Sequence, residues 1–192
     1  ASDLVGNLNC KHLTYLDVKV ATGEVLKPKY WDPLLEILRE RGFRHEQAFI
    51  EYLRAAGFSV TKIEGVEVLD SSVSDTIEAM KMGAEIIVQG ALKHGRWAGR
   101  IDILRRIETP SIFGNWSYEI IDTKLARETK GGTILQLCLY TYLLQEVQKY
   151  QPEYIYVVAP WSNYEPQRFR VSDYYAYFRK AKFAIEDAAK VE

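Results

Sequence analysis

The stretch that decides the fold is 117-SYEIIDTKLARETKGGTILQLCLY-140, which combines a strand, a loop and a helix. Tyr118 to Thr123 is a run of Tyr, Ile and Thr broken by two acids, which is typical of a mostly buried strand. Because side chains alternate along a strand, we expect Ile120, Asp122 and Lys124 on one face. A carboxylate and an ammonium at the end of an apolar strand are costly to bury. They indicate either an ordinary ion pair or a chemical site, and this stretch alone leaves both interpretations open.

The second half of this stretch predicts a helix. Two adjacent glycines, Gly131 and Gly132, mark a loop, and a helical run follows from Thr133 to about Tyr150. Gln136 and Tyr140 are four residues apart and therefore share one face of that helix.

Composition indicates one globular domain. The chain has 192 residues, of which 47% are hydrophobic and 27% charged, and no apolar run approaches the roughly 20 residues that cross a bilayer. We therefore expect neither a membrane partner nor a secretion signal. Two cysteines, Cys10 and Cys138, form neither a disulfide framework nor a zinc-ligand set, and free, buried cysteines fit a cytoplasmic protein. The first residue is Ala rather than Met, which is consistent with a piece excised from a longer protein.

Hydrophobic periodicity and turn residues predict a mixed α/β sheet flanked by helices. Asp32-Pro33 is a helix start signal, and Gly42 predicts a break or a close contact within the helix that follows. The expected helices are 2–8, continued less regularly over 10–20, then 34–56, 74–82, 133–150 and 172–190. The expected strands are 58–63, 85–92, 97–107, 118–123, 154–158 and 168–171. We divide the single domain into a helical lead-in (1–31), a core (32–175) and a carboxyl-terminal helix (172–192).

The net charge of −1 does not by itself indicate a nucleic-acid-binding protein, but the basic residues are clustered. Local basic patches can bind phosphate, although a solvated charged face explains them as well. One cluster lies in the predicted hairpin (Lys93, Arg96, Arg100, Arg105, Arg106) and the other after the predicted strand (Lys124, Arg127, Lys130).

Two further residues have unusual settings. Asp102 lies amid apolar residues of a predicted strand, where alternation places it on the face opposite Ile101 and Ile103, with Arg100 and Leu104. The default interpretation is an edge position facing water. His45 lies on the helix that begins near Pro33, and by default it is a surface or satisfied core histidine.

Together these residues predict a site for a hard metal ion. A histidine, two strand carboxylates and an adjacent lysine suit Mg²⁺ or Mn²⁺, which retain waters and take phosphate oxygens from a substrate. Such an ion lowers the pKa of a bound water, and Lys124 would help to orient that water. The expected chemistry is phosphodiester hydrolysis.

Four short motifs carry a family resemblance: GFRH (42–45), GRID (99–102), IDTK (121–124) and QLCLY (136–140). In this order they resemble the PD-(D/E)xK nuclease superfamily, in its RecB-like exonuclease branch. The resemblance implies a restriction-endonuclease-like core with the element order α-β-β-β-α-β. It also implies metal ligands at His45, Asp102 and Asp122, with the Thr123 carbonyl as a further candidate, and a catalytic lysine at Lys124. Gln136 and Tyr140 would contact substrate or brace the site, unless they serve only helix packing. Arg100, Arg105, Arg127 and Lys130 are the candidate nucleic-acid contacts.

The chain departs from the family pattern in two places. Many members of this branch hold an iron–sulfur cluster with four cysteines, and two cysteines cannot supply four ligands, so we expect no cluster. In the first motif Gly42 lies three residues before His45, a near variant that makes His45 the least secure ligand.

The function expected from the sequence is a metal-dependent deoxyribonuclease, acting as an exonuclease on single-stranded DNA ends or flaps in DNA repair or processing. The alternative is a catalytically silent module that binds nucleic acid or serves as a scaffold in a helicase–nuclease complex. The aromatic residues Tyr118, Trp97, Trp116 and Trp161 either stack on unpaired bases or belong to the core, and we expect core positions for at least half of them.

Overall fold

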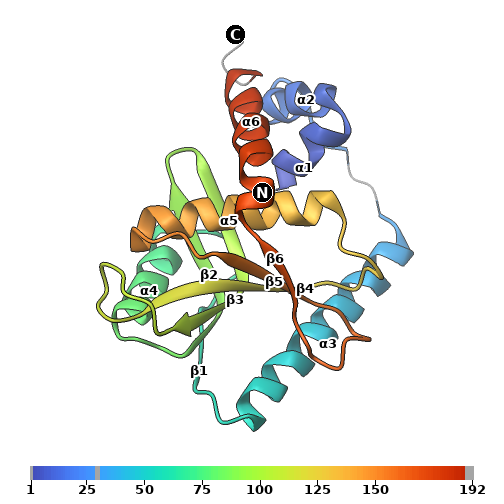
Figure 1. The fold of residues 1–192 in the computed structure, drawn as a ribbon. Helices are drawn as coiled ribbons and strands as arrows, with labels where there is room; N and C mark the ends of the chain where they lie inside the picture. Colours follow the sequence, from blue (N-terminus) through green and yellow to red (C-terminus); the bar gives the residue numbers. More distant parts are fainter. Residues whose placement is uncertain (1, 29–30, 189–192) are drawn as a thin grey trace.

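The chain is built around a six-stranded mixed β-sheet with helices on both faces (Figure 1). The computed structural model describes residues 2–28 and 31–188. The helices are α1 (Ser2–Asn9), α2 (Lys11–Ala21), α3 (Pro33–Ala55), α4 (Asp70–Lys81), α5 (Gly131–Gln148) and α6 (Ser172–Ala188). The strands are β1 (Val60–Lys62), β2 (Ile86–His94), β3 (Trp97–Ile107), β4 (Ser117–Thr123), β5 (Tyr154–Val158) and β6 (Gln167–Arg170). The expected mixed α/β architecture is therefore confirmed.

The strands lie in the sheet in the order in which they occur along the chain. β1 pairs with β2, and β4 with β5, in parallel, whereas the other neighbours are antiparallel. A parallel pair needs a crossover connection, which α4 and α5 supply here. The sheet thereby places the ends of β4 and β5 side by side, with Thr123 opposite Val158.

Two hydrophobic cores lie on opposite faces of the sheet. Ile120 of β4 belongs to the core beneath α4, α5 and α6, whereas its neighbour Ile121 belongs to the core beneath α3. Leu4 of α1 is fully buried in the first of these cores, and α1 contacts both α5 and α6. Figure 1 shows α1, α2 and α6 gathered on the far side of α5 from the sheet. Helix α1 is thus packed against the same core as α5, whereas α2 contacts α1 and α6.

Helix α3 begins and ends where the sequence predicts. The Asp32 carboxylate accepts a hydrogen bond from Leu34 N at 2.9 Å, and Gly57 follows the helix with φ of +94°. The predicted break at Gly42 is wrong, because α3 is continuous from Pro33 to Ala55. The alternative of a close contact is not seen either, because a Cβ at position 42 would lie 4.0 Å from Leu125 Cδ1, an ordinary contact.

Other boundaries differ in detail. Helix α4 begins at Asp70, four residues before the predicted start, and Ser72 Oγ accepts a hydrogen bond from Leu69 N at 3.0 Å. Strand β1 has only three residues. Cys10, expected to be buried, is exposed and separates α1 from α2, while Cys138 is buried. Within residues 2–28 and 31–188, no helix is long and apolar enough to cross a membrane.

Candidate active site

The site begins at an interruption in the pairing of β2 with β3. Every residue of β2 has a partner on β3 except Gln89, which would face Asp102 and whose φ is +57°. Residues two apart in a regular strand share a face, yet Ile101 lies in the core beneath α5 and Ile103 in the core beneath α3. The predicted alternation around Asp102 is therefore wrong. Asp102 is the position at which the side chains of β3 switch from one face of the sheet to the other.

The Asp102 carboxylate points to the neighbouring strand β4 rather than to water. The last pair of β3 with β4 is Ile103–Ile121, so the pairing does not extend to Asp102, the next residue along β3 toward its amino end. There Asp102 Oδ2 accepts hydrogen bonds from both the backbone N and Oγ1 of Thr123, each at 3.0 Å. The default interpretation of Asp102 as a water-facing edge residue is wrong, because it is half-buried and tied to the end of β4.

Asp122 and Lys124 form a buried ion pair beside Asp102. The Asp122 side chain is 1% exposed, and Lys124 Nζ lies 3.0 Å from its Oδ1 and 2.8 Å from its Oδ2. Only the contact with Oδ1 has hydrogen-bond geometry, so Asp122 Oδ2 is buried with no hydrogen-bond partner. This oxygen therefore depends on its ion-pair contact with the Lys124 ammonium at 2.8 Å.

The electrostatics of this group are unbalanced. Burial, together with the negative charge of Asp102, raises the pKa of Asp122 to about 8 despite the nearby ammonium. Burial lowers the pKa of Lys124, but the carboxylates of Asp122 and Asp102 act more strongly and leave that pKa above its ordinary value. The single ammonium of Lys124 thus does not offset the cost of ionising both Asp122 and Asp102.

A third carboxylate that the sequence motifs did not indicate, Glu46 of α3, lies close to this group. Glu46 is half-buried, and burial and the charge of Asp102 raise its pKa. Its Oε1 accepts a hydrogen bond from Gln89 Nε2 at 2.7 Å. Glu46 directly follows His45, and an acid on the sheet-facing side of the helix was the signal that could have identified it.

His45 is buried next to the same strand ends. Its Nε2 lies 2.9 Å from the carbonyl oxygen of Val158, which also accepts a hydrogen bond from Lys124 N at 3.0 Å. Because a carbonyl only accepts, Nε2 must carry the proton, which leaves the lone pair of a neutral ring on Nδ1. A ring N–H bonded to a backbone carbonyl is the usual arrangement of a metal-binding histidine.

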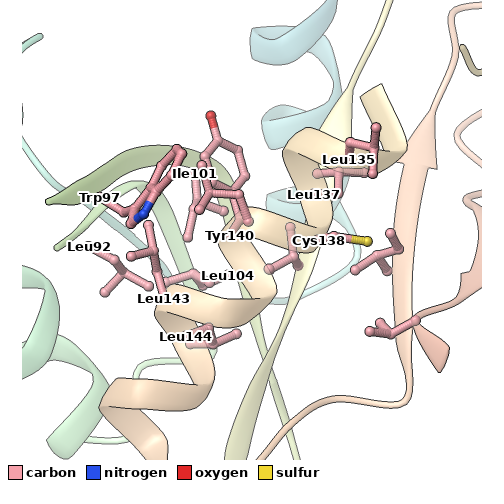
Figure 2. Packing of buried hydrophobic residues seen from close by; sticks show 14 of the residues in the cluster. Leu92, Trp97, Ile101, Leu104, Leu135, Leu137, Cys138, Tyr140, Leu143 and Leu144 are labelled. Carbon is pink, nitrogen blue, oxygen red and sulfur yellow. The ribbon is translucent and has the colours of Figure 1, made fainter. Parts of the chain in front are cut away.

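Gln136 and Tyr140 interact on α5. Gln136 Nε2 donates a hydrogen bond to the Tyr140 hydroxyl at 2.8 Å. Burial, and to a smaller extent the charges of Asp122 and Asp102, raises the pKa of Tyr140 to about 12. Figure 2 shows the Tyr140 side chain among Trp97, Ile101 and Leu143, with its hydroxyl at the edge of this packing. Both interpretations of the pair, bracing the site and packing the helix, fit this geometry.

The glycine of the GRID motif makes room for Tyr140. A Cβ on Gly99 would lie 2.8 Å from Tyr140 Cδ1 and 3.4 Å from Leu143 Cδ1. We expect Gly99→Ala to lower the free energy of unfolding by about 1–3 kcal/mol, since the buried ring has to move. Urea denaturation measures this change. In the matched variant Gly131→Ala, a Cβ meets nothing within 4 Å, and an equal loss in both variants would contradict the explanation.

The basic residues of the hairpin do not form one patch. Arg100 donates to the carbonyl oxygens of Ile63, Glu64 and Glu67 at 2.7–3.0 Å, and thus holds the loop after β1. Arg105 forms an ion pair with the buried Glu119 and stacks on Tyr156. Contact of Arg100 or Arg105 with nucleic acid would require these bonds to break.

Arg127 and Lys130 are in a different situation. They are exposed on the loop between β4 and α5, directly after Lys124. Of the four aromatic residues, Tyr118 is fully buried, Trp97 is 8% exposed and Trp116 is half-buried, whereas Trp161 is 53% exposed. Core positions for at least half of them are confirmed.

In the described ranges 2–28 and 31–188, no group of three or more His, Cys, Asp or Glu side chains is arranged so that it could hold a metal ion. Asp102 and Asp122 lie together with Lys124, and Glu46 lies near them, but Nε2 of His45 is directed to Val158.

No protein-family model matches the chain. The curated proteins compared with it contain no match either.

Proposed function

We propose that this chain is a metal-dependent nuclease that hydrolyses DNA phosphodiester bonds at the Asp102–Asp122–Lys124 group. The observation that carries the proposal is the fully buried Asp122 carboxylate, which is paired with the Lys124 ammonium at 2.8 Å and lies next to Asp102 and Glu46. One ammonium does not offset the cost of ionising three neighbouring carboxyl groups, and the raised pKa values of Asp122 and Glu46 reflect that cost. A divalent cation is the simplest group that would stabilise all three in the ionised form.

The donor types are those of a Mg²⁺ or Mn²⁺ site, although within residues 2–28 and 31–188 they do not already form a ligand group of three. Asp102 and Asp122, the Thr123 carbonyl and Nδ1 of His45 would hold the ion, with Glu46 as an additional acidic neighbour. Oxygen-rich sets of this kind suit hard cations that retain waters. The bound ion would activate a water and neutralise charge on the scissile phosphate. The four motifs and the order α3, β2, β3, β4, α5, β5 support a restriction-endonuclease-like core.

The chain's own residues have distinct roles in this proposal. Thr123 fixes the orientation of Asp102 through two hydrogen bonds, and Asp122 holds the Lys124 ammonium at the end of β4. That ammonium would orient the attacking water and stabilise charge that develops on the phosphate oxygens. Tyr140, kept neutral by its raised pKa, would hold its hydroxyl beside the carboxylates.

The proposed substrate is the end or flap of a single DNA strand. Arg127 and Lys130 are exposed on the loop that leaves the site, where they can contact phosphates, and the exposed Trp161 can stack on an unpaired base. We place the activity in DNA repair or processing, alone or beside a helicase.

A scaffolding role is the second candidate, because the first turns of α3 carry an apolar surface. Leu34, Leu35, Ile37 and Leu38 are each at least 43% exposed on one short stretch of helix. A surface of this kind is typical of a contact with another protein. A partner and a nuclease activity can coexist in one chain.

The test is cleavage of labelled DNA. Single-stranded, double-stranded and flapped substrates carry a label at the 5′ or the 3′ end and are incubated with Mg²⁺, Mn²⁺ or EDTA. We expect a metal-dependent ladder of products, strongest on single-stranded ends, whose label shows the polarity. A folded chain that shifts DNA in a gel but cuts none of these substrates would favour a catalytically silent module that binds nucleic acid.

A further inference from the structure

Gln89 combines two unusual features at one position. Its φ of +57° is in the left-handed region, which side chains other than Gly, Asn and Asp seldom adopt. It is also the residue of β2 that has no partner on β3. Such conformations persist only where the surroundings hold them, and they concentrate at functional sites.

The backbone of Gln89 is coupled to the direction of Asp102. On one side of the interruption, Val88 and Ile103 pair and belong to the core beneath α3. On the other side, Gly90 pairs with Ile101, and a Cβ on Gly90 would point at Leu104 and Thr76 of the opposite core. In both strands the side chains therefore switch faces at the same place, at Gln89 in β2 and at Asp102 in β3.

The turn has a consequence for the site. In a regular ladder Asp102 would lie on one face of the sheet, beneath one of the two cores. At the interruption its carboxylate instead lies between β3 and β4, where Thr123 N and Oγ1 bind it. The left-handed residue of β2 thus allows Asp102 to face the end of β4.

The side chain of Gln89 reaches the other element of the site. Its Nε2 donates to Glu46 Oε1 at 2.7 Å, and Glu46 lies near Asp102 and Lys124. The bond joins β2 to α3 across the site. An amide donor also fixes which Glu46 oxygen remains available to a ligand.

We propose that Gln89 is a positioning residue, which directs Asp102 through its left-handed backbone and Glu46 through its amide. This inference rests on the proposed function, because the two carboxylates need these orientations only if they hold a cation. Outer residues that orient ligands commonly change metal affinity by 10–100-fold.

Two substitutions separate the two roles. Gln89→Gly retains the left-handed backbone and removes the amide, whereas Gln89→Ala removes the amide and also disfavours the backbone conformation. Mn²⁺ binding to the full chain without DNA is measured by calorimetry, folding by urea denaturation, and kcat and KM on single-stranded DNA. The Gly variant is repeated in a Glu46→Ala background.

We expect Gln89→Gly to weaken Mn²⁺ binding about 10-fold with an unchanged urea midpoint, and to lower kcat more than it changes KM. Gln89→Ala should also lower the urea midpoint. In the Glu46→Ala background, Gln89→Gly should change Mn²⁺ binding less than about twofold, because the amide then has no acceptor. Mn²⁺ binding by Gln89→Gly that stays within twofold of the wild type would overturn the role of the amide, and binding by Gln89→Ala that is no weaker than that of Gln89→Gly would overturn the role of the backbone. A wild-type chain that neither binds Mn²⁺ nor cuts DNA would overturn the proposed function, and the inference with it.

Discussion

Replacing Lys124 with Ala is expected to lower the rate of DNA cleavage by about 10²–10⁴-fold. The lysine is the cation that touches the buried Asp122 carboxylate, at 2.8 Å, and it lies next to Asp102. Its loss removes the positive charge that would orient water and stabilise the phosphate. It also leaves Asp122 without its ion-pair partner, so that the pKa of Asp122 rises further and the carboxylate is a poorer ligand.

The Lys124 variant is measured with saturating Mg²⁺ on single-stranded DNA, with circular dichroism as the test of folding. Lys81→Ala is the matched control, since Lys81 is exposed at the end of α4 and should cut as the wild type does. A folded Lys124→Ala chain whose cleavage rate stays within tenfold of the wild type would show that the ammonium has no part in the chemistry.

Asp122→Asn is expected to stabilise the metal-free protein at alkaline pH, although it removes activity. The Asp122 carboxyl has an ordinary value of 3.8 and a pKa of about 8 in the fold. Between these values the folded chain binds a proton that the unfolded chain has released, so stability falls as the pH rises from about 4 to about 8. An amide in this position carries no charge and does not incur this cost.

We expect the free energy of unfolding of the wild type, relative to Asp122→Asn, to fall by at least about 1 kcal/mol between pH 5 and pH 8. Urea denaturation in EDTA at several pH values measures the difference, and Asp17→Asn, on the exposed surface of α2, is the control. Mg²⁺ should reduce the difference, because it favours the ionised carboxylate. A gap between the two proteins that does not change with pH would contradict the burial of an ionisable Asp122.

Much of the architecture could be predicted from local patterns. Strand β5 has the predicted limits, and the Asp32-Pro33 signal identified the start of α3, because capping and apolar runs act within a few residues. The contact between Asp122 and Lys124 also followed from alternation, because residues two apart in an extended chain share a face. These features depend on residues close together in the chain.

The features that the sequence did not predict depend on contacts between distant residues. Asp102 departs from alternation because Gln89, on another strand, is left-handed, and no pattern around Asp102 indicates this. Glu46 enters the site only because α3 lies against the turn of β2 and β3. The basic residues of the hairpin were predicted to gather, but Arg100 and Arg105 bind partners in different parts of the fold.

The central claim, that this chain cuts DNA with a cation held by Asp102 and Asp122, is tested most directly by one comparison. Wild type and Asp122→Asn are incubated side by side with end-labelled single-stranded DNA in Mg²⁺, Mn²⁺ or EDTA. We predict cutting by the wild type that needs the metal and disappears in the variant, while the variant still folds and still shifts the DNA. Equal cutting by both proteins, or cutting by the wild type in EDTA, would contradict the account.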